Sequence, residues 1–245
     1  MKTNYLLVII PLILLGLTFI YGCSEKGERG IKFSADSQSI TFDFSPNFNI
    51  NNDFSFECNI KLLEEPQKST MIFGTSRSYA KAYGLYLYDS KIGFGIRSAN
   101  NRALVQTNEY SLNQWLHLTG TYSGKNKKVS FFIDGTLIGS NILTEEDISL
   151  ANENLIINGA YSLQGQPESI GFSKFIISNV RLWNITLSES NIINNMDKIL
   201  NGNEEGLLGY WPMNQTEGET VPDKTSNNHN GTINGGEWFL DKNSK

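Results

Sequence analysis

The stretch KVSFFIDGTLIGS, residues 128–140, decides the fold class of this 245-residue chain. Two β-rich runs, Lys128–Ile133 and Thr136–Ser140, flank the pair Asp134-Gly135. A two-residue hairpin turn with positive φ angles prefers such a pair. The sequence therefore predicts an antiparallel hairpin at this point.

Similar short runs, separated by clusters of Gly, Asn, Asp and Ser, continue along the chain from residue 31. A second hairpin is predicted where Tyr83–Tyr88 and Lys91–Arg97 flank Asp89-Ser90. Many short strands with regular turn signals are typical of an all-β sandwich. The predicted strands are Ile31–Phe33, Ser39–Phe42, Phe54–Lys61, Thr70–Gly74, Tyr83–Tyr88, Lys91–Arg97, Leu116–Tyr122, Lys128–Ile133, Thr136–Ser140, Leu155–Ile157, Phe172–Trp183, Gly206–Pro212 and Glu237–Leu240.

One amphipathic helix is predicted after Trp183. Thr186 and Glu189 have the spacing of a capping box, and apolar residues follow at helical spacing up to Leu200. Gly202 is the expected end of this helix. Residues 215–236 are rich in Asn, Gly, Thr and Asp, which predicts a long surface loop before the closing strand.

Composition indicates one globular domain and excludes some partners. Charged residues make up 18% of the chain, aromatic residues 11%, and 22 residues are glycine, which suits a folded chain with many turns. All-β sandwiches of this length commonly form a single domain. The net charge of −5 and the lack of a basic tract argue against nucleic acid as a partner.

The N-terminus has the features of an export signal. Lys2 precedes an uncharged apolar run from Tyr5 to Tyr21, which Gly22 and Cys23 follow. The segment resembles a bacterial lipoprotein signal, and this resemblance implies cleavage after residue 22 and lipid attachment at Cys23. The alternative is an uncleaved anchor helix, since the run approaches the length that spans a bilayer. Both alternatives place the rest of the chain outside the cytoplasm.

We therefore expect a signal peptide over residues 1–22, a lipidated tether over 23–30, one domain over 31–241 and a tail over 242–245. Lipid at Cys23 leaves Cys58 as the only free thiol, so no disulfide is expected. Cys58 alternates with Phe54, Phe56 and Ile60 in a strand, which predicts a buried position for it.

A series of motifs resembles the bacterial laminin-G-like jelly roll over roughly residues 31–240. Their order and spacing carry the resemblance. The motifs are Phe54-Ser-Phe-Glu57, Trp115-Leu-His117 with Gly120-Thr-Tyr122, Phe131-Phe-Ile-Asp134-Gly135, Val180-Arg-Leu-Trp183 with Leu187-Ser-Glu189, Gly209-Tyr-Trp211-Pro-Met213, and Asp223 to Gly231. The resemblance implies a two-sheet, antiparallel, concanavalin A-like sandwich with one concave face. Lectins and glucanases share this superfamily, so fold alone does not choose a function.

The enzymatic function is not favoured. Laminarinase-type glucanases of this superfamily carry Glu-x-Asp-x-x-Glu on one strand, whereas the nearest segment here has Leu150 in place of the second glutamate. We expect no enzyme activity; a glucanase-type glycoside hydrolase is a remote alternative that needs two carboxylates about 5 Å apart in space. Glu57 is expected to face outward, solvated or paired, and His117 to pack or hydrogen-bond at the sheet surface.

No cofactor is required by any motif, but a structural Ca²⁺ ion is considered. Several members of the superfamily use calcium to hold their terminal strands, and Ca²⁺ takes oxygen ligands from loop carboxylates and carbonyls. Asp36 and Asp223 are the candidate ligands by position. The alternative is that both are turn or surface aspartates.

Sugar binding needs exposed aromatic faces and planar polar groups. We expect these groups in loops, and the candidate ligand-binding residues are Arg77, Tyr79, Tyr83, Arg102, Asn158 and Tyr161. The sequence predicts a non-catalytic carbohydrate-binding domain, anchored by its lipid to the membrane, with the outer membrane as the expected site. The alternative is a protein-binding or structural domain for cell-envelope adhesion, with a cell-surface protein as its partner.

Overall fold

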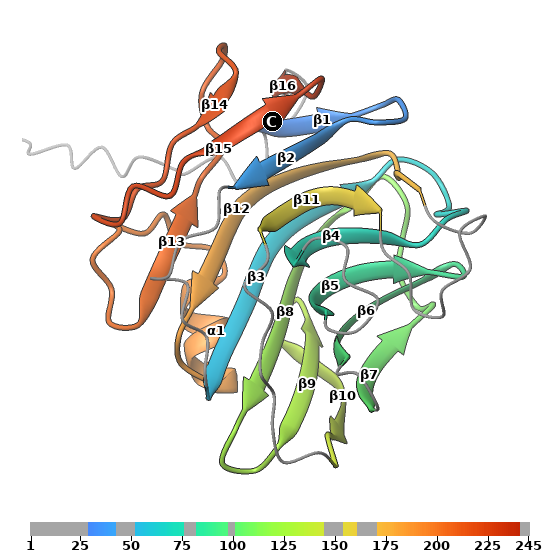
Figure 1. Cartoon of the computed structure of the whole chain (residues 1–245), viewed down its shortest axis with the longest axis vertical. Helices are drawn as coiled ribbons and strands as arrows, with labels where there is room; N and C mark the ends of the chain where they lie inside the picture. The colour runs from blue at the N-terminus through green and yellow to red at the C-terminus, as the bar shows by residue number, and fades with distance from the viewer. Residues whose placement is uncertain are drawn as a thin grey trace, which may run out of the picture.

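The computed structural model describes residues 29–42, 52–75, 82–97, 101–144, 154–160 and 171–240. Within these ranges the chain forms two antiparallel eight-stranded sheets, so the predicted all-β sandwich is confirmed. Figure 1 shows the long strands of one sheet beside the shorter, curved strands of the other. The predicted signal peptide and the lipidation site at Cys23 lie outside the described residues. No helix in the described part is long and apolar enough to cross a membrane.

Sheet A has the order β10-β9-β8-β3-β12-β1-β16, and β13 also pairs with β12. Its long central strands carry the polar residues Glu57, His117 and Arg181. The bounds are β1 Arg29–Phe33, β3 Asp53–Leu62, β8 Trp115–Ser123, β9 Lys128–Ile133, β10 Thr136–Ile142, β12 Phe175–Trp183, β13 Leu207–Trp211 and β16 Glu237–Leu240.

Sheet B has the order β14-β15-β2-β11-β4-β5-β6-β7. Its bounds are β2 Ser39–Phe42, β4 Thr70–Thr75, β5 Ala82–Tyr88, β6 Lys91–Arg97, β7 Arg102–Thr107, β11 Leu155–Ala160, β14 Thr220–Val221 and β15 Gly231–Asn234. β7 forms the last strand at one end of the sheet, opposite to β14.

The core lies between the two sheets and is rich in aromatic rings. Phe54 and Phe56 of β3 pack against Phe94 of β6 and Tyr83 of β5, with ring centroids 5.4–6.4 Å apart. Alternate residues of each strand point inward, because successive side chains of a strand lie on opposite faces. Each fully buried ring of this size contributes about 1.5–3 kcal/mol relative to exposure. Cys58 is also fully buried, as predicted.

Both predicted hairpin turns are confirmed by their backbone angles. Asp134 and Gly135 have φ of 49° and 76°, and Asp89 and Ser90 have φ of 50° and 54°. Two successive positive φ angles are the requirement of the turn that matches the twist of antiparallel strands. These turns fix the register of β9 with β10 and of β5 with β6.

The helix α1 is shorter than predicted and begins later. It spans Glu189–Asn195, and its N-cap is Ser188, whose hydroxyl accepts a hydrogen bond from the Asn191 N–H. The Thr186 hydroxyl instead donates to the Tyr122 carbonyl at 2.7 Å, so the predicted capping box is wrong. The helix ends well before Gly202.

The predicted loop over residues 215–236 is also wrong in part. Two short strands, β14 and β15, lie within it, and β15 pairs with β2. Gly231 to Asn234 extend sheet B in this way, although only Gly231 and Ile233 are buried. A strand this short and half polar has little periodic signal, so its partner β2 decides its structure.

Candidate functional site

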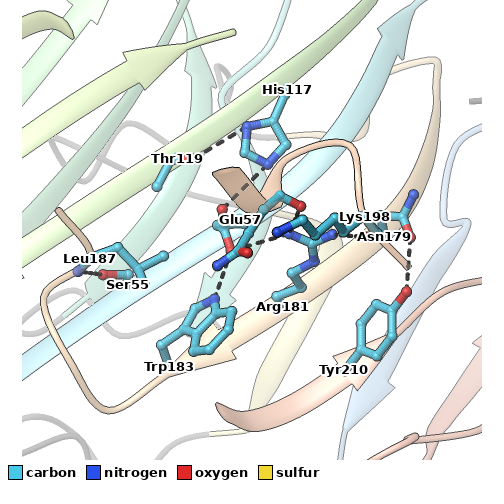
Figure 2. Close-up of polar contacts among 11 residues, drawn as sticks. Ser55, Glu57, His117, Thr119, Asn179, Arg181, Trp183, Leu187, Lys198 and Tyr210 are labelled. Carbon is cyan, nitrogen blue, oxygen red and sulfur yellow. Dashed lines mark hydrogen bonds and ion pairs between the residues drawn. The ribbon is translucent and has the colours of Figure 1, made fainter. Parts of the chain in front are cut away.

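The polar contacts in Figure 2 centre on Glu57, which lies on the outer face of sheet A. Trp183 donates a hydrogen bond from Nε1 to the Glu57 carboxylate at 2.7 Å. The Arg181 guanidinium lies 3.6 Å from the same oxygen, and His117 Nε2 lies 3.4 Å from the other. Glu57 and Arg181 have no exposed surface, and His117 is 7% exposed.

Arg181 connects this cluster to the end of α1. Its guanidinium donates to the carbonyls of Asn195 at 3.0 Å and Lys198 at 2.6 Å, and it lies over the Tyr210 ring. Carbonyls at a helix end lack partners within the helix and favour a cation. The arginine therefore holds the helix against the outer face of sheet A.

The Glu57 carboxyl is ionised at neutral pH. Burial by itself would raise the pKa of Glu57, but the neighbouring His117 ring and the positive charge of Arg181 lower that pKa by more, so the net effect is a lowered pKa. The prediction that Glu57 faces away from the core is correct, and the pairing is as expected, but the residue is not solvated. A carboxylate without exposed surface cannot touch a substrate, so this cluster is structural.

The outer face of sheet B offers a different kind of surface. On β5, β6 and β7 the outward positions include three glycines, at 84, 93 and 95, while Tyr86, Tyr88, Leu104 and Gln106 lie on the same face. Gly84 pairs with Gly95, and Gly95 pairs with Leu104, so two glycines and a leucine lie side by side across the three strands. Met71 and Tyr86 in the middle of this face are buried.

The accessible part of this face runs along β7 and its neighbours. We call it the β7 strip, and it consists of Tyr88, Arg97, Arg102, Leu104 and Gln106. Arg102 and Gln106 are exposed, and the other three are half-buried. This surface combines an aromatic ring, an aliphatic side chain, an amide and two guanidinium groups, which are the groups that polar, ring-shaped ligands require.

Hydrogen bonds orient the β7 strip. Tyr86 donates from its hydroxyl to Gln106 Oε1 at 3.1 Å, so the Gln106 amide nitrogen remains a donor for a ligand. Asn141 of β10 donates from Nδ2 to the Leu104 carbonyl, which ties the end strand of sheet B to sheet A. The Asn101 side chain hydrogen-bonds both Thr144 and the Arg102 N–H at the start of β7.

The structure corrects the position of two predicted sugar-binding residues. Tyr83 points into the core, is 4% exposed and packs against Phe54 and Phe56, so it cannot present its ring to a sugar. Asn158 is fully buried with φ of 54°; it donates to the Gln38 carbonyl and accepts from the Ser173 N–H. Its amide therefore holds the backbone together rather than facing a ligand.

Arg102 is exposed as expected, but it begins the strand β7 instead of lying in a loop. Arg77, Tyr79 and Tyr161 lie outside the described residues. Of the six predicted residues, the structure therefore places only Arg102 on an accessible surface within its described part.

The two candidate calcium ligands are placed in different settings. The Asp223 carboxylate accepts four hydrogen bonds, from the N–H groups of Tyr210, Thr225 and His229 and from the Thr225 hydroxyl. Asp36 is exposed and lines a shallow pocket of about 110 Å³ together with Glu64 and Lys174. Among the described residues, no group of three or more His, Cys, Asp or Glu side chains could hold a metal ion.

Sequence reasoning missed Tyr88, Leu104 and Gln106. The alternation in Arg102–Thr107, with Ala103 and Val105 buried, was the available signal for a strand with an outward polar face. Both faces of β5 carry apolar side chains, so its sequence could not say which tyrosines face solvent.

A laminin-G family model described as the concanavalin A-like lectin/glucanases superfamily matches residues 34–193. No curated protein is significantly similar in sequence to the chain. The strands after residue 193 belong to the same two sheets as the matched segment.

Several solved structures share the fold at low identity. A Bacteroides ovatus protein for which carbohydrate binding has been proposed is 19% identical with a TM-score of 0.61; the match covers 87% of this chain but 60% of that one. A heptameric SAP-like pentraxin from Limulus polyphemus is 14% identical with a TM-score of 0.54, over 89% and 98% of the two chains. The sialidase CBM40 module from Ruminococcus gnavus is 14% identical with a TM-score of 0.53, over 69% and 97%. These values establish a common fold only.

Proposed function

The chain belongs to the concanavalin A-like lectin/glucanase superfamily, and from this premise we propose that it is a non-catalytic carbohydrate-binding domain of a membrane-anchored bacterial lipoprotein. Its role is to capture glycans or to attach the cell to a glycan-bearing surface. The chain is similar in fold to the Bacteroides ovatus protein and to the Ruminococcus gnavus module, of which there is a structure bound to α2,3-sialyllactose.

The observation that carries the proposal is the composition of the β7 strip. Tyr88 supplies a ring face, and Gln106 supplies an amide nitrogen whose orientation is fixed by Tyr86. A sugar ring has apolar C–H faces and a rim of hydroxyls, so it needs both kinds of group. The buried cluster around Glu57 lies on the other sheet and contributes nothing to this surface.

A glycan array tests the proposal. The wild-type protein is compared with Tyr88→Ala and Gln106→Ala, and Asn59→Ala serves as the control because Asn59 is half-buried on the outer face of the other sheet. We expect saturable binding of at least one glycan class that either strip variant weakens and the control leaves unchanged. Binding that all three variants leave unchanged would move the site elsewhere, and a blank array would reject the function.

Membrane attachment is a separate part of the proposal. The apolar run that ends at Cys23 supports lipidation of that cysteine. Wild-type protein is expected to fractionate with membranes and to incorporate a labelled fatty acid, and Cys23→Ala is expected to lose the label. Label that persists in Cys23→Ala would reject lipidation at this residue.

A second candidate function is protein binding, which one observation favours. The end strand β10 exposes Leu137, Ile138 and Ile142 at 45%, 38% and 52%, and Ile193 of α1 is 48% exposed. Exposed apolar side chains on the end strand of a sheet favour contact with another protein. A blank glycan array together with a partner lost in Leu137→Ser would favour this function.

A further inference from the structure

We propose that the β7 strip selects anionic glycans, which carry carboxylate or sulfate groups. This inference deepens the proposed carbohydrate-binding function and rests on it. Two arginines carry it, since Arg97 of β6 and Arg102 of β7 are directly opposite each other on the outer face of sheet B.

Directly opposite residues on an antiparallel pair have Cβ atoms about 4.5–5.5 Å apart, and like charges in that position destabilise the sheet. A structural role would be better served by an acidic residue at one of the two positions. Arg97 is half-buried and has an interaction partner of its own, whereas Arg102 is exposed. Arg102 is therefore the guanidinium that can meet a ligand.

The charges on this face differ from those of the whole chain. The outward positions of β5, β6 and β7 carry three cations, at Lys91, Arg97 and Arg102. No outward position of these strands carries an acidic residue. Asp89, in the adjoining turn, lies 3.9 Å from Lys91 and accounts for that lysine. Arg102, whose side chain is exposed, is therefore a cation available on this face of a protein whose net charge is −5.

The geometry of the strip also suits a chain of sugars. Arg102 and Gln106 are four residues apart on one face of β7, which corresponds to about 13 Å. A ligand that contacts both is longer than one sugar ring. The start of β7 is held by the Asn101 side chain, which accepts from the Arg102 N–H and hydrogen-bonds Thr144, so the arginine backbone is fixed before binding. A guanidinium donates two parallel hydrogen bonds to a carboxylate or sulfate, which a lysine cannot reproduce.

The test is calorimetric titration of the purified full chain with three oligosaccharides of similar length. One is an oligogalacturonate, which carries carboxylates; one is a heparin fragment, which also carries sulfates; the third is a neutral cello-oligosaccharide. Variants are Arg102→Gln, Arg102→Lys and the control Lys128→Gln, whose lysine is exposed on the opposite sheet. A thermal melt verifies that each variant is folded.

We expect an anionic ligand to bind and the neutral one to bind more weakly. Loss of a charged hydrogen bond predicts that Arg102→Gln weakens anionic binding roughly ten- to a hundredfold, with Arg102→Lys intermediate and Lys128→Gln unchanged. Binding is also expected to fall as salt rises. The carboxylate and sulfate arms identify which group is preferred.

Preferential binding of the neutral oligosaccharide, or anionic binding that Arg102→Gln leaves unchanged, would overturn this inference and leave carbohydrate binding intact. Binding of no oligosaccharide, here and on the glycan array, would overturn both.

Discussion

Substitution of Glu57 by glutamine tests whether the buried cluster on sheet A stabilises the fold. The variant keeps the size of the side chain and a hydrogen-bond acceptor for Trp183, but it removes the charge that faces Arg181 at 3.6 Å. Arg181 then remains fully buried without a counter-charge. The matched control is Glu64→Gln, because Glu64 pairs with Lys174 at 3.0 Å while both side chains are nearly half exposed.

Removing one partner of a buried ion pair costs about 3–5 kcal/mol, whereas an exposed pair contributes about 0–1 kcal/mol. In a domain of this size, each kcal/mol shifts Tm by about 2–4 °C, so Glu57→Gln is expected to lower Tm by roughly 6–20 °C. Glu64→Gln is expected to change Tm by no more than about 4 °C. Thermal and urea unfolding, followed by circular dichroism, measure both.

The pH dependence follows from the direction of the Glu57 pKa. Because the folded pKa is lower than the unfolded value, unfolding takes up protons as the pH falls, and the folded state loses stability. The stabilisation from Glu57 is complete above the unfolded pKa, near 4.5, and is lost as the pH falls through the folded pKa. The difference in stability between wild type and Glu57→Gln should therefore narrow below about pH 4.5. A variant as stable as wild type at pH 7, or a difference that grows in acid, would refute the reasoning.

Three further predictions concern other parts of the fold. Gly120→Ala is expected to lower stability by about 1–3 kcal/mol, because an added Cβ would meet the Phe94 ring, and Phe94→Leu should restore part of the loss in the same urea assay. Burial raises the pKa of Cys58, so in a Cys23→Ser background a thiol reagent is expected to label it only on unfolding; rapid labelling of the native protein would contradict this. Calcium and EDTA are expected to leave Tm unchanged, since four donors already occupy the Asp223 carboxylate, and a Tm that rises with calcium would show that a metal site exists.

The buried cluster on sheet A and the outward face of β5 could not be assembled from sequence. Glu57 and its partner Arg181 are 124 positions apart, and only the pairing of β3 with β12 brings them together. On β5, Tyr83 faces the core and Tyr88 faces the other way. Because Leu85 and Leu87 alternate with Gly84 and Tyr86, the strand has no clear polar face, and the covering sheet decides which set is buried.

The sequence by itself determined the fold class, the turns between β9 and β10 and between β5 and β6, and the burial of Cys58. Hydrophobic alternation and turn preferences depend on residues close together in the chain, so they can be recognised in the sequence without knowing which strands pair. Tertiary structure alone decided the start of α1, where Thr186 bonds the Tyr122 carbonyl instead of capping the helix, and the pairing of β15 with β2. Each depends on contacts between distant segments, where packing and hydrogen bonds outweigh the weak preferences of a few residues.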